Sequence, residues 1–245
     1  MRKPIMAGNW KMNKNEIEAI DFAKQLKPLV ADVDSVTILA CPPYPVLSKV
    51  HDVIKDSSIK LGAQNLFWED KGAYTAEVSG PMLKAVGCTY VIIGHSERRQ
   101  YFGETDETVN KRLMAALKHN LIAVVCVGET LAQREANETF KVVETQVKGA
   151  FNNVSKEQWE KIVVAYEPVW AIGTGKTATP DQAQEVHKFI RGLLPKEVAE
   201  KVRILYGGSV KPENVKTLMA QPDIDGGLVG GASLKVDSFI KLIKY

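Results

Sequence analysis

The stretch AYEPVWAIGTGKTA, residues 165–178, places a carboxylate at the end of an apolar run. Residues 162–166 are β-branched, small or aromatic, as in a buried strand of a parallel sheet, and Glu167 follows them directly. Pro168 fixes the backbone at the exit, and the apolar segment after it ends in the flexible GTG of residues 173–175. These features predict an acid or base at a strand end, beside an apolar lid that excludes water from a reacting centre.

A helix start follows the lid. Residues 179–182 read TPDQ, with threonine as the N-cap, proline at the first helical position and glutamine at the third. The apolar stripe of that helix comprises Ala183, Val186, His187, Ile190 and Leu194. Strand, loop and helix together make one βα unit.

The same unit recurs along the whole chain. Eight strands in 245 residues give about 31 residues per unit, the size of a βα repeat, and no linker divides the chain. We therefore expect an α/β fold, a single-domain (β/α)₈ barrel over residues 1–245, with an open doubly wound sheet as the alternative. The predicted strands are Ile5–Asn9, Val36–Cys41, Lys60–Gln64, Tyr90–Gly94, Ile122–Val127, Ile162–Tyr166, Arg203–Gly207 and Gly226–Val229.

Two phosphate-binding motifs resemble part of the opening stretch but fail on spacing. Residues 175–177 could end a nucleoside-triphosphate phosphate loop, but that motif needs a glycine where Trp170 stands. Gly173 could begin a dinucleotide fingerprint, but it lies seven residues past the strand end instead of in the tight turn. A glutamate and a proline by themselves would also suit an ordinary βα connection with a surface glutamate.

The composition is that of an ordinary globular protein, with 45% hydrophobic and 25% charged residues. A net charge of +3 without a dense basic block argues against nucleic acid, and no apolar run approaches membrane length. The three cysteines are far apart, and no metal-ligand spacing joins them to a histidine. We interpret Cys41, Cys88 and Cys126 as reduced core thiols of a cytoplasmic protein that holds no metal.

In a barrel, the turns after the strands meet at one face, where sites are built. Lys11 would be a substrate cation or a surface lysine, and His95 a proton-transfer group or a structural histidine. Proton chemistry is favoured because Glu167 should lie opposite His95. Glu97 and its two arginine neighbours more simply form an ion-pair network that supports the loop. The glycine-rich turns at 207–210 and 230–233 predict a phosphate site or plain tight turns.

The segment from Gln64 to Ser79 is long and aromatic for a loop, with Phe67, Trp68 and Tyr74. A loop of this length and character predicts a partner surface.

Five motifs, taken together, resemble the triosephosphate isomerase family over the whole length of the chain. They stand in the family's order and spacing, which makes the match specific. The motifs are GNWKMN at 8–13, IGHSERR at 93–99, AYEPVWAIGTG at 165–175, YGGSV at 206–210 and LVGGAS at 228–233.

The resemblance implies the interconversion of dihydroxyacetone phosphate and D-glyceraldehyde 3-phosphate in glycolysis and gluconeogenesis, without a metal or organic cofactor. It makes Glu167 the base, His95 the electrophile and Lys11 the cation that binds substrate, supported by Asn9; this family is itself the standard example of such a glutamate and a neutral histidine. The phosphate cradle would be Gly173, Ser209, Gly230 and Gly231. The family's homodimer, through the loop Gln64–Ser79, is also implied.

One position departs from the family pattern. The interface loop usually has a glycine after Tyr-Thr, and this chain has Ala76, which bears on the loop backbone and the strength of the dimer. Two other classes share the glycine-rich turns: another phosphate-binding barrel enzyme, and a non-catalytic phosphate-binding or interaction protein. The trio of Lys11, His95 and Glu167 favours the isomerase over both.

Overall fold

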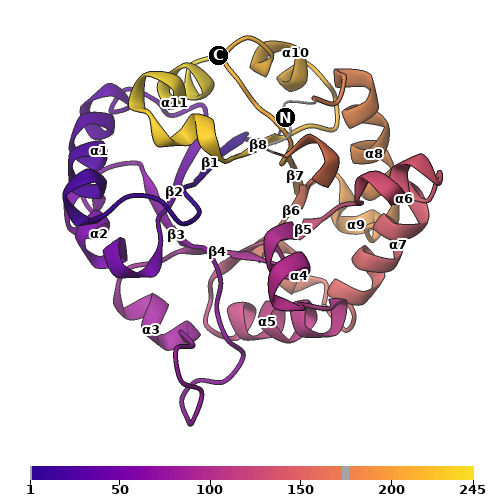
Figure 1. Ribbon diagram of the computed structural model, residues 1–245, viewed down its shortest axis with the longest axis horizontal. Coiled ribbons are helices and arrows are strands. Elements are labelled where there is room, and N and C mark those ends of the chain that lie inside the picture. The colour runs from indigo at the N-terminus through magenta and orange to yellow at the C-terminus, as the bar shows by residue number, and fades with distance from the viewer. Residues whose placement is uncertain (1, 173–176) are drawn as a thin grey trace.

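The computed structural model describes residues 2–172 and 177–245. Its strands form a closed parallel barrel in which each strand pairs with the next and β8 pairs with β1 (Figure 1). This confirms the predicted (β/α)₈ barrel and rules out the open sheet. The strands are β1 (Ile5–Asn9), β2 (Thr37–Cys41), β3 (Lys60–Ala63), β4 (Tyr90–Ile93), β5 (Ile122–Val127), β6 (Ile162–Tyr166), β7 (Arg203–Tyr206) and β8 (Gly226–Val229).

Four predicted strands are one residue too long at one end. At Gly94 the reason is visible, since its φ of 68° turns the chain out of the extended conformation after β4. The four residues that fall outside the observed strands are Val36, Gln64, Gly94 and Gly207.

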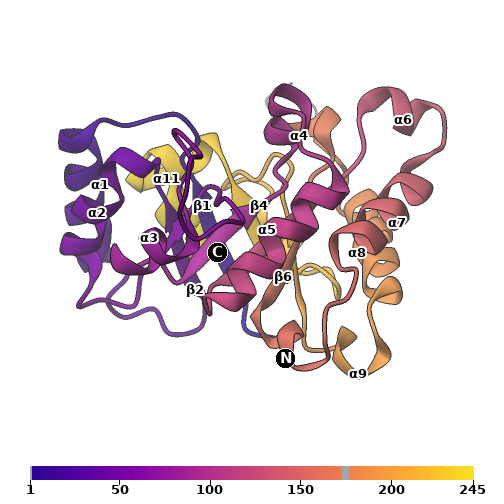
Figure 2. The ribbon, with the colours of Figure 1, turned by 90° about the horizontal axis from the view of Figure 1, so that it is seen from below.

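Helices cover the outside of the barrel (Figure 1). Seen from the side, α4 and α6 lie at one end and α9 at the other (Figure 2). The helices are α1 (Glu16–Leu29), α2 (Leu47–Ile54), α3 (Gly80–Ala85), α4 (Ser96–Phe102), α5 (Asp106–Lys118), α6 (Leu131–Glu135), α7 (Thr139–Ala150), α8 (Pro180–Leu193), α9 (Lys196–Ala199), α10 (Val215–Met219) and α11 (Val236–Ile243). Short 3₁₀ turns are η1 (Tyr44–Val46), η2 (Glu157–Lys161), η3 (Val169–Ala171) and η4 (Gly231–Leu234).

The start of α8 has the predicted capping box. The Thr179 side chain accepts a hydrogen bond from the Gln182 N–H, and the Gln182 side chain accepts one from the Thr179 N–H. The predicted apolar stripe is buried from Ala183 to Ile190, with Leu194 just past the helix end. Local sequence therefore fixes where the chain re-enters a helix after the lid.

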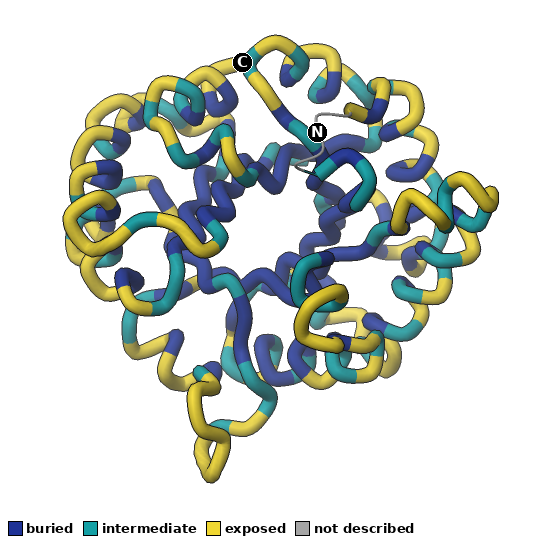
Figure 3. Tube along the Cα trace, viewed as in Figure 1, coloured by how far each residue is buried: buried dark blue, intermediate teal, exposed yellow. Residues whose placement is uncertain are grey.

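The apolar core has two layers, because successive strand residues point to opposite faces of the barrel wall. The inner cluster contains strand residues only, and the outer one joins the wall to the helices, so the buried ring in Figure 3 is covered on both sides. Cys41 and Cys126 lie in the inner cluster and Cys88 in the outer one, all three buried and free. Burial raises the pKa of each thiol, that of Cys88 to about 12. Among the helices of the described residues, none is long and apolar enough to cross a membrane.

The loop between β3 and α3 extends away from the barrel (Figure 1). Phe67 stacks on Trp68 and also contacts Tyr74, with ring centroids 4.1 and 4.7 Å apart. Residues 71–77 at the tip are exposed. Ala76, the residue that departs from the family pattern, has a φ of 76°, in the left-handed region that glycine adopts without strain.

Candidate active site

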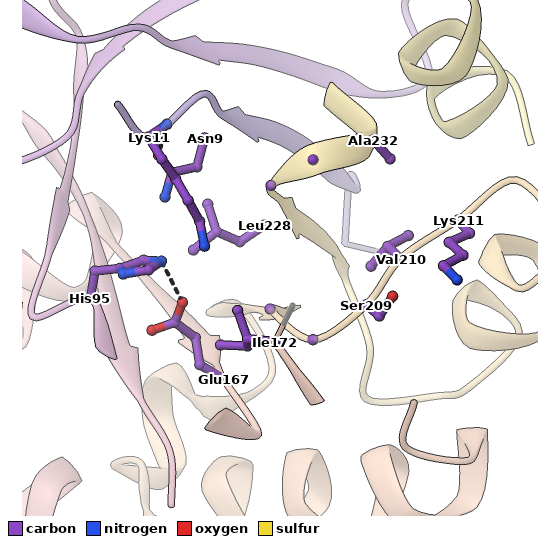
Figure 4. A pocket seen from close by; sticks show the side chains of 14 residues that line it. Asn9, Lys11, His95, Glu167, Ile172, Ser209, Val210, Lys211, Leu228 and Ala232 are labelled. Carbon is purple, nitrogen blue, oxygen red and sulfur yellow. Dashed lines mark hydrogen bonds and ion pairs between the residues drawn. The ribbon is translucent and has the colours of Figure 1, made fainter. Parts of the chain in front are cut away.

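A pocket of about 270 Å³ opens where the strands end, at the face that the barrel geometry predicts (Figure 4). It brings together nearly all of the predicted site residues, from β1, β4, β6, β7 and β8 and the turns after them. Gly173 lies outside the described residues. The predicted residues that line the pocket are Asn9, Lys11, His95, Glu167, Ser209, Gly230 and Gly231.

Glu167 is buried at the floor of this pocket, with 2% of its surface exposed. Its Oε1 lies 2.9 Å from His95 Nε2, and its Oε2 accepts a hydrogen bond of 2.9 Å from the Ser96 N–H. The expectation that Glu167 and His95 face each other is therefore correct, and the two are in direct contact.

Two glycines leave the space that Glu167 needs. A Cβ at Gly128 would lie 1.8 Å from the Glu167 carbonyl oxygen, and one at Gly207 would lie 2.8 Å from Glu167 Cγ. The first approach is to backbone, which cannot move aside. The glycines at the ends of β5 and β7 thus belong to the support of the carboxylate.

His95 is the N-cap of α4, and this fixes its tautomer. Its Nδ1 accepts a hydrogen bond of 3.2 Å from the Glu97 N–H, so in the neutral ring the proton is on Nε2. The Nε2–H then points at Glu167. We assign the tautomer from these two contacts.

The two buried groups shift each other's pKa. Burial by itself would lower the pKa of His95, but the adjacent Glu167 carboxylate, with Glu97 further away, raises it above its ordinary value. Burial would raise the pKa of Glu167, but His95, the Ser96 N–H and Lys11 outweigh it and the pKa lies below its ordinary value. Glu167 is accordingly a carboxylate at neutral pH.

Lys11 follows β1 in a strained conformation, with a φ of 53°. Asn9 holds it there, because its Oδ1 accepts a hydrogen bond of 3.1 Å from the Lys11 N–H. The Lys11 Nζ lies 2.6 Å from Glu97 Oε1. Glu97 is therefore paired with the pocket lysine and does more than support its own loop. Arg98 and Arg99 do form the predicted network, with Glu104 and Asp106 respectively.

The two glycine-rich turns form another wall of the pocket. Gly230 lies against Lys11, since a Cβ there would be 3.4 Å from Lys11 Cε. In the turn after β7, Asn214 Nδ2 donates to the Ser209 carbonyl at 3.0 Å. After β8, the Ser233 hydroxyl donates to the Gly230 carbonyl at 2.7 Å and so closes the second turn.

The first residues of the predicted lid are bonded to the turn after β5. Trp170 Nε1 donates a hydrogen bond of 2.9 Å to Glu129 Oε1, and the Tyr166 hydroxyl lies 3.2 Å from both oxygens of the same carboxylate. Glu129 is fully buried and is also 3.3 Å from Arg134. Ile172, the last lid residue before the gap in the described chain, lines the pocket.

Comparison with known proteins identifies the family. The family model described as triosephosphate isomerase matches residues 4–245. The chain belongs to the triosephosphate isomerase family. Proteins named triosephosphate isomerase from Endomicrobium trichonymphae, Moorella thermoacetica and Geotalea uraniireducens are 62%, 58% and 57% identical to it, each over 100% of this chain and 99% of its own length. As a member of the triosephosphate isomerase family, the protein is an enzyme, an intramolecular aldose–ketose isomerase.

Two site residues of this family member escaped the sequence reasoning. Gln64 Nε2 donates to the carbonyls of Lys11 and Cys41, both at 2.9 Å, and so holds the loop after β1. Its position directly after β3 was a usable signal. Glu129 is the second residue after β5, and its hydrogen bonds to Tyr166 and Trp170 could not be predicted from residue spacing. Within residues 2–172 and 177–245 no cluster of three or more His, Cys, Asp or Glu residues could hold a metal ion.

Proposed function

We propose that this protein interconverts dihydroxyacetone phosphate and D-glyceraldehyde 3-phosphate through an enediolate, with Glu167 as base, His95 as electrophile and Lys11 as substrate-binding cation. The observation that carries the proposal is the contact of 2.9 Å between His95 Nε2 and Glu167 Oε1 at the floor of a pocket that Lys11 also lines. The proposed reaction needs a carboxylate and a hydrogen-bond donor that act on two adjacent carbon centres and their oxygens, and this pair supports it by holding both groups side by side.

Glu167 takes the proton from the carbon next to the carbonyl and returns it to the neighbouring carbon. In the present geometry its oxygens accept from His95 and the Ser96 N–H, which lower its pKa. Substrate that accepts the hydrogen bond from His95 removes part of this stabilisation, so the carboxylate becomes a stronger base when substrate is bound.

His95 Nε2–H donates to the carbonyl oxygen and moves a proton between the two oxygens of the enediolate. The hydrogen bond from the Glu97 N–H to Nδ1 supports this role because it keeps the donor on the pocket side. Lys11 Nζ, beside Gly230, steadies the negative charge that develops.

The phosphate is bound by the backbone N–H groups of the turns at Gly173, Ser209, Gly230 and Gly231. The lid closes over the intermediate, because an enediol phosphate exposed to water would lose its phosphate. The reaction uses neither a metal nor an organic cofactor.

Shortening the base tests the assignment. Glu167→Asp withdraws the carboxylate by about 1 Å, which costs on the order of a hundredfold in kcat. Circular dichroism should show an unchanged fold, and Glu185→Asp, an exposed position on α8, is the matched control. Turnover of Glu167→Asp close to that of the parent would reject Glu167 as the base.

We further propose a homodimer in which the loop Gln64–Ser79 enters the neighbouring subunit. Its exposed tip and the exposed side chains of Met12 and Phe102, 96% and 66% accessible, support this arrangement. Met12 and Phe102 border a cavity of about 280 Å³ that is also lined by Lys11, His95 and Glu97, so a docked loop would brace the catalytic groups.

Sedimentation and activity measured while the protein is diluted test the dimer. Thr75→Arg, which puts a bulky charge at the loop tip, should lower the association constant and the activity together, whereas Thr75→Ser should not. Full activity in a sample shown to be monomeric would reject the link between association and activity.

We also infer a cytoplasmic location, which the three free thiols support. Recovery of the protein from the periplasm or medium would contradict this inference.

A further inference from the structure

We propose that Lys211 is a second cation for the phosphate of the substrate: it attracts and holds the dianion at the end of the pocket remote from His95, and takes no part in proton transfer. The inference rests on the proposed function for the nature of the substrate. The phosphate dianion would then contact a positive charge at the turn after β7, where without Lys211 it would contact only neutral N–H groups.

The place of Lys211 in the pocket carries the proposal. Lys211 lines the same cavity as Glu167 and Lys11, two residues beyond Ser209. Figure 4 shows Lys211 at the opposite end of the pocket from His95 and Lys11, on the loop that also carries Ser209. An anion held by the turn after β7 is therefore on the Lys211 side of the site.

The backbone beneath Lys211 is fixed. Its N–H donates to Asn214 Oδ1 at 2.8 Å, while Asn214 Nδ2 donates to the Ser209 carbonyl at 3.0 Å. One amide side chain thus ties Lys211 and Ser209 together. Val210 between them is buried with 4% of its surface exposed, and Pro212 restricts the backbone of Lys211 from the other side. The ammonium group is tethered to a rigid turn next to the anion site.

The charge of Lys211 is also available. Among the described residues, no carboxylate forms an ion pair with it, whereas Lys11 is paired with Glu97 at 2.6 Å. Glu167 adds a negative charge to the pocket floor and repels an incoming dianion. Without Lys211, the charges lining the pocket would not favour a doubly negative ligand. Most exposed lysines are simply solvated, and that alternative predicts no specific effect on phosphate.

The test uses inorganic phosphate as the probe, with binding followed by calorimetry and by competitive inhibition of turnover. Lys211→Gln should raise the dissociation constant of phosphate about two- to fivefold at low ionic strength, the range of one exposed charge pair. The difference should shrink at about 0.3 M salt, where screening is strong. Lys211→Arg should keep the parent affinity.

Lys216→Gln is the matched control, because this substitution removes the same charge from the protein. Lys216 is an exposed lysine on α10 and lines none of the cavities described above. For the triose phosphate, Lys211→Gln should raise KM and leave kcat unchanged. Turnover of unphosphorylated D-glyceraldehyde should not change. These measurements distinguish a lysine that binds the phosphate from a general effect of net charge or of protein stability.

Equal phosphate affinity of Lys211→Gln and Lys216→Gln at low ionic strength would overturn the inference, and so would an equal change in D-glyceraldehyde turnover. Calorimetry needs no turnover. Suppose that Lys211→Gln binds phosphate more weakly than the parent, Lys211→Arg and Lys216→Gln, but that the parent does not isomerise triose phosphate. That result would refute the proposed function and support the role of Lys211 in binding phosphate.

Discussion

His187 should make the fold sensitive to acid. It lies fully buried on α8 between the rings of Tyr166 and Tyr206, with centroids 5.7 and 6.2 Å away. Its Nδ1–H donates to the Asp223 carbonyl at 3.1 Å, and among the described residues its Nε2 has no hydrogen-bond partner. Burial lowers the pKa of His187 to about 3, because a second proton would have to enter an apolar site.

The size of the effect follows from the two pKa values. The unfolded chain takes up this proton near pH 6.5 and the folded chain near pH 3, so between these values the unfolded state binds more protons. The free energy of unfolding therefore falls as the pH falls below 6.5, by about 1.4 kcal/mol per pH unit. At pH 4.5 the loss relative to neutral pH is about 3 kcal/mol, and by pH 3, where the folded chain is itself half protonated, it is about 4 kcal/mol.

Urea unfolding at a series of pH values from 7.5 to 4.5 measures this slope. His187→Gln keeps a donor but cannot titrate, so its free energy of unfolding should fall less steeply with pH than that of the parent. Val186→Ala, a buried change on the same helix, should lower stability by the same amount at every pH. All measurements need one protein concentration, because association would shift them. Parallel curves for parent and His187→Gln between pH 6.5 and 4.5 would refute the reasoning.

Two further predictions concern the loops. Ala76→Gly removes a left-handed strain of about 1 kcal/mol at each loop tip, so the dimer should persist to greater dilution in sedimentation; an unchanged midpoint would mean that the loop does not dock in this conformation. The double change of Trp170 and Ile172 to glycine should weaken lid closure and release methylglyoxal and inorganic phosphate during turnover, as measured by end-point assays of both. A double variant that leaks no more than the parent would contradict water exclusion by the lid.

The barrel and the gathering of the site were predictable because they depend on features that repeat. Apolar strands at regular spacing indicate a closed wall, and the wall puts Lys11, His95 and Glu167 at one face whatever the details of the loops. The capping box at Thr179 was predictable for the same reason, since it depends on four consecutive residues.

Side-chain pairings across different turns could not be predicted. Glu97 was expected to support its own loop, but its carboxylate also pairs with Lys11, which comes from a turn 86 residues earlier in the chain. Gln64 was counted as a strand residue although it holds the loop after β1. The alanine itself gives no sign of the left-handed backbone at Ala76, and only the glycine of the family pattern pointed to an unusual conformation there.

The seam between β1 and β8 makes the site a product of the complete chain. Asn9 and Lys11 come from the first strand and Gly230 from the turn after the last one, and the two strands are hydrogen-bonded neighbours. During synthesis on the ribosome, β1 can pair early with β2, but its other neighbour, β8, emerges only when nearly the whole sequence has been made. On the proposed function, a chain that lacks β1 or β8 should therefore fail to bind substrate, and activity should begin only when the ring closes. A cut that removes β1 or β8 should therefore lower activity more than a cut in an exposed central loop.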